Sequence, residues 1–256
     1  IEGTLENNFK ATATQLEEAI TDKTKAVIFS SPCNPTGSVF SQEELEAIAN
    51  VVKAHEGIMV IADEIYELIN FTGKNFSIAS LPRMFERTIT VNGFSKGYAM
   101  TGWRVGYICA PVEIAKAVEK IQGQFTSGGT GIAQRAALAA IAGDQTPSKE
   151  MAEAYFKRRQ LVLELLQEIP GIKTHIPEGA FYFFPDVTSY FGKSAHGHTV
   201  NNADDLCLYL LDVAHVSLVT GSAFGAPNCV RLSYAASEEE LKEALKRLKK
   251  ALGDLS

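Results

Sequence analysis

Short apolar segments alternate with amphipathic segments along the chain up to about Gly143. The apolar segments lack strict alternation of apolar and polar residues, which is typical of strands covered on both faces of a sheet. They comprise residues 26–30, 58–62, 88–91 and 105–110. The amphipathic segments predict helices at residues 42–55, 111–122 and 132–141. Strands that alternate with helices in this way imply parallel pairing through crossover connections.

The clearest helix signal follows Ser41. Four apolar side chains recur there at helical spacing and would share one face, namely Leu45, Ile48, Ala49 and Val52. Ser41 suits the N-cap, and Glu44 three residues later completes a capping box. The sequence therefore predicts both the start and the buried face of this helix.

The pattern changes after residue 147. A long amphipathic segment at residues 148–167 predicts a helix that connects two domains. The segments that follow are predicted as strands at 171–176, 180–184, 216–219 and 229–234, and as helices at 203–213 and 238–252. Residues 192–202 are predicted to form a long polar loop. We therefore expect an α/β domain with a mainly parallel sheet at residues 1–147, and an interdomain helix with a small α+β domain at residues 148–256.

Composition narrows the class of protein. The chain has 256 residues, is 46% hydrophobic and 21% charged, and carries a net charge of −6, so it is globular and has no basic footprint for nucleic acid. No segment is long and apolar enough for a membrane helix, and no leader pattern opens the chain. The four cysteines have irregular spacing, which favours a reducing cytoplasm over a disulfide framework. We expect a small-molecule partner and no nucleic-acid or membrane partner.

Polar residues follow the predicted strands, where open α/β sheets present their ligand sites. In SPCNPTG, residues 31–37, two prolines and a glycine fix a turn that aims the side chain of Asn34. The alternative is a plain turn in which Asn34 bonds its own backbone. In ADEIY, residues 62–66, Asp63 ends a buried strand and therefore needs a positive partner, whereas Glu64 is expected to be solvated.

Two further segments carry cationic candidates. NGFSKGYAMTGWRVGY, residues 92–107, places Lys96 at a strand exit ahead of Arg104, so an amine able to form an imine would lie near an anion-binding guanidinium. In the second domain, Arg231 interrupts the apolar strand of VRLSY and needs an anion, either structural or a substrate carboxylate.

Taken together, SPCNPTG, ADEIY, FSKGYAMTGWRVGY and RLSYA resemble, in this order, the class I and II aminotransferases of fold type I, which depend on pyridoxal 5'-phosphate. The resemblance covers essentially the whole chain and is nearest to the bacterial branch similar to aspartate aminotransferase. It implies the aspartate aminotransferase fold, with residues 1–147 as the C-terminal part of the large coenzyme-binding domain.

The resemblance also implies roles for individual residues. Lys96 would hold the coenzyme as an imine and then move the proton between the substrate α-carbon and the coenzyme. Asp63 would pair with the pyridine nitrogen and favour the protonated ring. Asn34 and Tyr66 would hydrogen-bond the phenolic oxygen of the coenzyme.

The remaining implied roles concern anions. Ser95 and Arg104 would bind the phosphate, Arg231 would bind the α-carboxylate of the substrate, and Asn34 would also contact the substrate. A substrate held by Arg231 and Lys96 would bridge the two domains. Gly93 stands where many relatives carry a second phosphate-binding serine, so that role is not assigned here.

The implied activity is transfer of an amino group between an amino acid, aspartate or a similar one, and a 2-oxo acid. A β-lyase on the same scaffold and a catalytically silent fragment are the alternatives. The family's upstream third has no counterpart in this sequence, so we expect a C-terminal fragment that is inactive alone, from a full-length protein that is a homodimer.

Two other segments contain residue types found in ligand sites, but neither has the full pattern of a metal site or a phosphate-binding loop. His196 and His198 have no third ligand motif and are expected to lie in a polar loop. The glycine-rich segment at residues 127–131 lacks the lysine and the spacing of a P-loop, so it predicts the lead-in to a helix.

Overall fold

The computed structural model describes residues 1–256, which divide into two compact units. The first unit contains Ile1, Lys10–Cys33 and Ser38–Ala152, and the second contains Glu2–Phe9, Asn34–Gly37 and Glu153–Ser256. The later boundary falls inside helix α5 (Thr146–Gln167). Each unit has its own apolar core.

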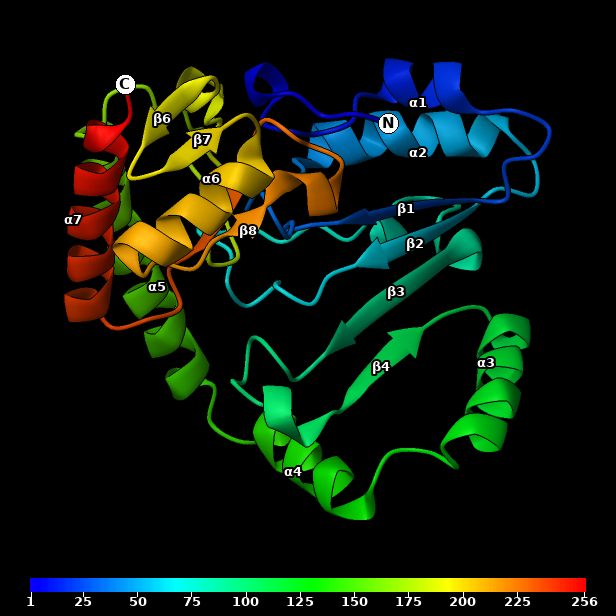
Figure 1. The fold of residues 1–256 in the computed structure, drawn as a ribbon. Coiled ribbons are helices and arrows are strands. Elements are labelled where there is room, and N and C mark those ends of the chain that lie inside the picture. The colour runs from blue at the N-terminus through cyan, green and yellow to red at the C-terminus, as the bar shows by residue number, and fades with distance from the viewer. The chain divides into compact units, whose positions relative to one another are not determined.

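The first unit is built on a four-stranded sheet (Figure 1). Its strands, in spatial order, are β1 (Ala26–Ser30), β2 (Met59–Asp63), β3 (Thr88–Gly93) and β4 (Gly106–Cys109). The pairs β1–β2 and β2–β3 are parallel, as expected, but β4 runs antiparallel to β3. The parallel expectation was wrong for β4 because its connection from β3 contains one 3₁₀ turn, Thr101–Trp103, and no crossover helix.

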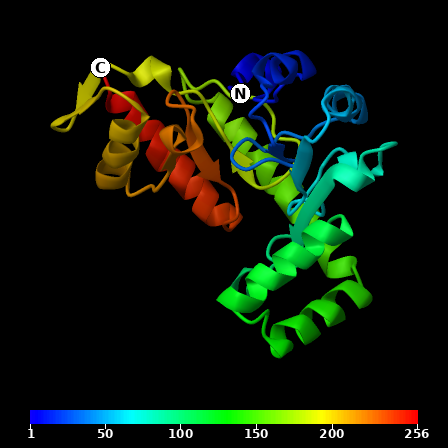
Figure 2. The same cartoon turned by 90° about the vertical axis from the view of Figure 1, so that its right-hand side faces the viewer.

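Helices α1 (Ala13–Ala19) and α2 (Gln42–Ala54) lie on one face of β1 and β2, while α3 (Val112–Phe125) and α4 (Gly131–Ala142) lie toward β4 (Figures 1 and 2). The capping box of α2 is present: Glu44 N–H donates to Ser41 Oγ at 3.2 Å, and Ser41 N–H donates to Glu44 Oε2 at 2.7 Å. The predicted apolar face is buried against the sheet, together with Leu16 of the unpredicted α1.

The second unit contains two small antiparallel sheets. One has the order β5 (Tyr182–Phe183), β9 (Val230–Ser233), β8 (Val219–Thr220), and the other is the hairpin β6 (Lys193–Ala195) with β7 (His198–Val200). The helices are α6 (Ala203–Tyr209), which continues as a π-helical turn over Leu210–Ala214, and α7 (Glu238–Asp254). The C-terminal half of α5 packs on this core through Val162 and Leu166.

Several predicted boundaries in the second unit need correction. Residues 171–176 form no strand, because only Lys173 bridges to Asp186. Residues 192–202 are not simply a polar loop: they contain the β6–β7 hairpin, whose turn at His196 and Gly197 takes the left-handed backbone region. The predicted strand at 216–219 begins only at Val219.

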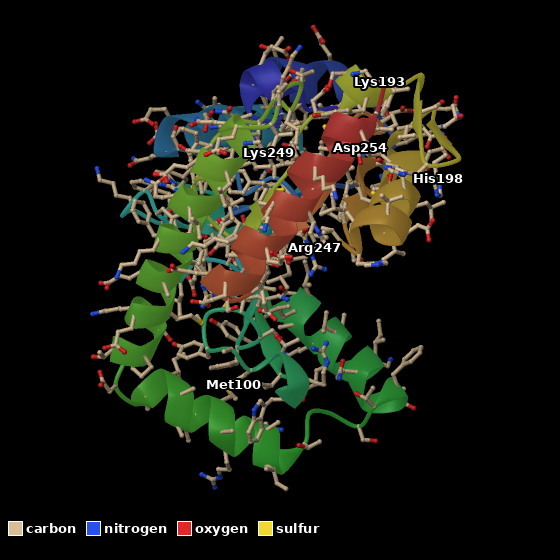
Figure 3. The ribbon with its side chains drawn as sticks, turned by 60° about the vertical axis from the view of Figure 1, so that its left-hand side comes forward. Met100, Lys193, His198, Arg247, Lys249 and Asp254 are labelled. Atoms are coloured by element: carbon tan, nitrogen blue, oxygen red, sulfur yellow. The ribbon has the colours of Figure 1, made fainter.

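Both histidines of this hairpin lie against carboxylates of neighbouring helical segments, and Figure 3 labels His198 and Asp254. His196 Nε2 lies 2.9 Å from Asp254 Oδ2 of α7, and His198 Nε2 lies 2.9 Å from Asp212 Oδ2. Both rings also contact the ring of Tyr209. These contacts hold the hairpin on α6 and α7.

None of the helices combines the length and apolar character that a membrane crossing requires. All four cysteines, Cys33, Cys109, Cys207 and Cys229, are free thiols.

Candidate functional site

The register of the first sheet brings the predicted residues of the first unit to one edge. Asp63 is the last residue of β2 and pairs with Ser30 of β1 and Val91 of β3. Because these strands are parallel, the segment after β3 leaves at the same edge as Asp63. β4 starts there too, since it is antiparallel and Gly93 pairs with Gly106. Asp63, Tyr66, Ser95, Lys96 and Arg104 therefore belong to this edge, and we call them the carboxyl-edge cluster.

Asp63 and Tyr66 are fixed by the tight turn that follows β2. The N–H of Ile65 donates to Asp63 Oδ1 at 3.1 Å, and the N–H of Ile69 donates to the carbonyl of Tyr66 at 2.8 Å. Asp63 is half-buried, whereas Tyr66 is 3% exposed. One carboxylate oxygen is thus occupied by the backbone, and the carboxyl group stays at the strand end.

Lys96 lies on the turn that follows β3. Its ammonium nitrogen is 5.8 Å from the centre of the Tyr66 ring, within the range of a cation–π contact. The Lys96 carbonyl accepts from the N–H of Ala99 at 3.1 Å, and the Ser95 carbonyl accepts from Thr101 Oγ1 at 2.8 Å. Both Ser95 and Lys96 are half-buried, so the turn is ordered while the amine still reaches the edge.

Arg104 is exposed and stands in the left-handed backbone region, with φ 52° and ψ 51°. Its Nη1 donates to the carbonyl of Thr101 at 2.8 Å. It also lines an open groove of about 750 Å³ whose other walls come from Trp103, α3, α4 and the glycine-rich segment between these helices. Arg104 therefore brings a guanidinium to the wall of an open groove, and a guanidinium binds anions through its paired N–H donors.

The exit of β3 is closely packed. A Cβ on Gly93 would lie 2.9 Å from Gly106 Cα and 3.1 Å from the Val105 carbonyl oxygen. A serine at this position would meet backbone rather than a flexible side chain. The departure from the family pattern at Gly93 therefore has a packing reason in this chain.

Within the second unit, the structure brings Asn34 and Arg231 together. Arg231 Nη1 donates to Asn34 Oδ1 at 2.8 Å, although the two residues are 197 positions apart. The Arg231 guanidinium lies over the rings of Tyr182 at 4.6 Å and Phe224 at 5.1 Å. Arg231 is half-buried on β9 and Asn34 is exposed. We call these two residues the arginine–asparagine pair.

The segment that carries Asn34 is anchored by its own unit. The Gly37 carbonyl accepts from the N–H groups of Glu178 and Gly179, both at 2.8 Å. His175 Nε2 lies 2.8 Å from the Thr36 carbonyl oxygen, and because a carbonyl only accepts, this ring nitrogen carries the proton. Gly37 has φ 73° and no space for a Cβ, which would lie 2.6 Å from Pro177. The turn is therefore held by contacts at long sequence separation, in addition to its own prolines and glycine.

One expectation about the carboxyl edge was wrong. Glu64 is half-buried rather than solvated, and burial raises the pKa of its carboxyl above the ordinary value. A hydrogen bond from Ser77 opposes this shift, while the nearby charges of Glu67 and Asp63 add to it. The edge therefore brings the carboxyl group of Glu64 near those of Asp63 and Glu67, which favours the neutral form of Glu64.

Sequence reasoning missed three side chains that support the candidate residues. Tyr182 and Phe224 sandwich Arg231, and Glu67 bonds Asn92 at the exit of β3. The aromatic run around Tyr182 was visible, but its pairing with an arginine on another strand is set by the β5–β9 register. No local pattern would have revealed it.

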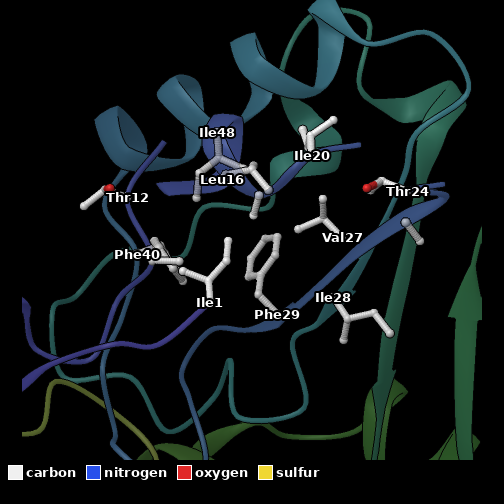
Figure 4. A pocket seen from close by; sticks show the side chains of 13 residues that line it. Ile1, Thr12, Leu16, Ile20, Thr24, Val27, Ile28, Phe29, Phe40 and Ile48 are labelled. Carbon is white, nitrogen blue, oxygen red and sulfur yellow. The ribbon is translucent and has the colours of Figure 1, made fainter. Parts of the chain in front are cut away.

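A second cavity of the first unit offers no such chemistry. It has a volume of about 320 Å³ and lies between α1, α2 and β1 (Figure 4). Its walls are mainly apolar, with Ile1, Ile28 and Phe29 among them, and they include no titratable side chain. None of the candidate site residues lines this cavity.

The chain matches the family model of aminotransferase class I and II over residues 2–248. It therefore belongs to the class I and II aminotransferase family. The aspartate aminotransferase fold, expected from the motifs, is confirmed: the crystal structure of the aspartate aminotransferase from Rhizobium meliloti superposes with a TM-score of 0.95 at 42% identity.

Two other relatives show how much these similarities cover. A bifunctional aspartate aminotransferase and glutamate/aspartate-prephenate aminotransferase from Petunia hybrida is 48% identical over 243 residues, which are 93% of this chain and 50% of that protein. An aromatic aminotransferase from Pyrococcus horikoshii is 40% identical with a TM-score of 0.91, and the match covers 98% of this chain and 66% of that one. The Rhizobium match covers 100% and 65%. The chain thus spans about half to two thirds of the length of these relatives.

Proposed function

We propose that this chain supplies the lysine-bearing part of a pyridoxal-phosphate-dependent transaminase. The observation that carries the proposal is the sheet register: Asp63 ends β2 paired with Val91 of β3, and the segment with Ser95 and Lys96 follows that strand. Family membership supports the reaction class.

The donor set of the carboxyl-edge cluster fits pyridoxal phosphate. That coenzyme presents an aldehyde, a pyridine nitrogen, a phenolic oxygen and a phosphate, and each has a complementary side chain in the chain. Lys96 offers an amine for the aldehyde, and Asp63 a carboxylate for the ring nitrogen. Ser95 and Arg104 offer donors for the phosphate. In this proposal residues 1–147 are the C-terminal part of the coenzyme-binding domain, and residues 148–256 are the interdomain helix and the small domain.

When bound, pyridoxal phosphate supplies an electron sink for the bond that breaks at the substrate α-carbon. The amine of Lys96 would take the proton from the α-carbon and deliver it to the coenzyme, which requires the neutral amine within hydrogen-bond reach of both positions. Asp63 holds a proton at the pyridine nitrogen, because a nearby carboxylate favours the charged form of a base. The hydroxyl of Tyr66 in the first unit and the amide of Asn34 in the second are each a donor that would suit the phenolic oxygen.

Arg231 binds the α-carboxylate of the amino acid and of the 2-oxo acid in this proposal. The Arg231 guanidinium lies over the Tyr182 and Phe224 rings, and one of its N–H groups donates to Asn34, so the other N–H groups are the ones that would bind a carboxylate. Aspartate is the proposed amino donor, supported by the names of several relatives, while another relative is named an aromatic aminotransferase.

Reductive labelling tests the proposal. The chain is incubated with pyridoxal phosphate and borohydride, and the modified lysine is mapped by mass spectrometry. We expect near-stoichiometric labelling at Lys96 and none in Lys96→Ala, with Lys120→Ala on α3 as the control. Labelling spread over surface lysines, with Lys96 not preferred, would overturn the assignment.

The reaction is then read from products. An amino acid with a 2-oxo acid acceptor should yield the new amino acid, whereas pyruvate and ammonia formed without an acceptor would indicate the β-lyase instead. The chain alone and the longer protein are assayed in parallel. The expectation that the chain is inactive alone stays a prediction until then.

A homodimer and a cytoplasmic location are also proposed for the full-length protein. Apolar side chains that would suit burial in an interface are exposed on α3 and α4, among them Ile121, Phe125 and Ile132. Light scattering tests the oligomeric state. Free thiols at all four cysteines suit a reducing compartment, and cell fractionation tests the location.

A further inference from the structure

A buried amide side chain connects two of the loops at the carboxyl edge. Asn92, in β3, is 7% exposed. Its Nδ2 donates to Glu67 Oε1 at 2.8 Å, and its Oδ1 accepts from the N–H of Gly93 at 2.7 Å. Glu67 belongs to the turn after β2, where its own N–H donates to the Glu64 carbonyl at 2.9 Å. The amide of Asn92 thus ties the β2 exit to the β3 exit.

Loss of these two hydrogen bonds would destabilise the folded chain. A buried polar group left without its partner carries its full desolvation penalty, and a hydrogen bond to a charged group is stronger than a neutral one. The backbone around Asn92 is also closely packed, because a Cβ on Gly93 would lie 2.9 Å from Gly106 Cα and a Cβ on Gly106 would lie 3.0 Å from the Asn92 carbonyl oxygen. The backbone at Gly93 therefore has little freedom while the amide is held.

The Glu67–Asn92 hydrogen bond lies next in sequence to the segments that carry Lys96 and Tyr66. Ser95 and Lys96 follow Gly93 closely in the chain, and the far side of their turn is held by the bonds of Ser95 O to Thr101 and of Lys96 O to Ala99. Tyr66, whose ring contacts the Lys96 ammonium, immediately precedes Glu67. One hydrogen-bonded chain, Glu67 to Asn92 to Gly93, thus runs beside both residues of the cation–π contact.

We propose that Glu67 and Asn92 are positioning residues, which lock the β2 exit to the β3 exit and so set the Lys96 amine against Asp63 and Tyr66. The proposal rests on the proposed function for the role of Lys96. Glu67 touches neither substrate nor coenzyme in this view. Its carboxylate acts on the position of Lys96 through the amide of Asn92.

Exchanging the hydrogen-bond donor and acceptor between positions 67 and 92 tests whether this hydrogen bond positions Lys96. Asn92→Asp keeps an oxygen for the N–H of Gly93 but sets two carboxylates against each other. Glu67→Gln keeps an acceptor oxygen for Asn92. The double variant Glu67→Gln/Asn92→Asp restores a bond in the opposite sense, because the amide introduced at position 67 can donate to the carboxylate introduced at position 92. Glu17→Gln, whose glutamate pairs with His55 at 2.9 Å elsewhere in the first unit, is the matched control.

Two readouts are compared. The first is hydrogen exchange of the peptide containing Gly93, measured without coenzyme. The second is the rate at which pyridoxal phosphate and borohydride label Lys96. In Asn92→Asp we expect exchange to rise and labelling to fall, each about tenfold. Glu67→Gln, the double variant and the control should stay within about threefold of the unmodified chain.

The comparison of the double variant with Asn92→Asp decides between the outcomes. A double variant that labels Lys96 no faster than Asn92→Asp, or an Asn92→Asp that labels it at the unmodified rate, would overturn the proposal. If Asn92→Asp does not fold, Glu67→Ala replaces it: it removes the acceptor without adding charge, and unchanged labelling and exchange there would equally overturn the lock. Failure of the unmodified chain to label at Lys96 would instead contradict the proposed function, and the exchange measurement separates the two cases because it needs no coenzyme.

Discussion

The two arginines proposed to bind anions are supported in different ways. Arg104 is exposed on a loop, and its guanidinium bonds only a carbonyl of that same loop, at Thr101. Arg231 stands on a strand, between two aromatic rings and beside the amide oxygen of Asn34. One guanidinium is therefore held by its own short segment, and the other by side chains from three separate segments.

This difference affects how strongly each arginine contributes to binding its anionic ligand. A side chain fixed before binding loses little rotamer freedom when its ligand arrives, so its bonds are expressed almost fully in affinity. A side chain on an exposed loop must first be ordered, which offsets part of its gain. We therefore expect Arg231 to be the more sensitive to substitution, and Arg104 to tolerate more change in its ligand.

The largest effect is expected for Arg231→Ala. Loss of two charge-assisted hydrogen bonds to a carboxylate should lower kcat/KM for the amino acid by about 100-fold in the active full-length protein. Arg231→Lys should recover little, because an ammonium cannot match the planar pair of donors. Steady-state kinetics with several amino acids measure this, with Arg247→Ala on α7 as the control. An unchanged KM for all of them would contradict the role of Arg231.

A smaller effect is expected for Arg104→Ala. It should weaken binding of pyridoxal phosphate about tenfold and leave binding of pyridoxal, which lacks the phosphate, unchanged. Titration followed by absorbance compares the two compounds, and Arg135→Ala on α4 serves as the control. Equal losses for both compounds would show that Arg104 acts on the loop and not on the phosphate.

The carboxyl-edge cluster was more predictable than the arginine–asparagine pair for a physical reason. Parallel strands expose their carboxyl ends at one edge, so Asp63 and Lys96 could be placed together from the strand pattern alone. Asn34 and Arg231 were each predicted as site residues, but their bond joins positions 197 apart and depends on how the second unit folds. Their contact lay beyond any local signal.

Two other errors, at the β6–β7 hairpin and at Glu64, also concern contacts that no local pattern reveals. The β6–β7 hairpin at Lys193–Val200 is short and polar, and its two strands are paired by a turn at His196 and Gly197 rather than by an apolar pattern. Burial of Glu64 could not be inferred because it depends on how the turns after β2 pack, which also brings Ser77 and Glu67 near its carboxylate. Periodicity predicts which face of an element is buried, whereas contacts between loops need the fold.

A third prediction concerns the rings that support Arg231. Phe224→Leu removes one of the two cation–π contacts and should raise KM for the amino acid about threefold with kcat unchanged. Phe224→Tyr keeps a ring at the same place and should behave as the unmodified protein does. Equal KM values for the Leu and Tyr variants would show that Tyr182 and Asn34 suffice to hold the guanidinium.

The smallest effect concerns Glu64, a carboxylate that the first unit buries at its edge. Because burial raises its pKa in the folded chain above the ordinary value, the folded state binds this proton more tightly than the unfolded state does. The stability that the proton provides is complete below the unfolded pKa and is lost as the pH rises through the folded pKa. Glu64→Gln removes that loss.

The Tm of Glu64→Gln should therefore equal that of the unmodified chain at about pH 4 and exceed it by no more than about 2 °C at about pH 7. Thermal unfolding across this range, with Glu86→Gln as an exposed control, measures the difference. A variant less stable at neutral pH than at acid pH, relative to the unmodified chain, would mean that the bond from Ser77 to the charged carboxylate outweighs its burial.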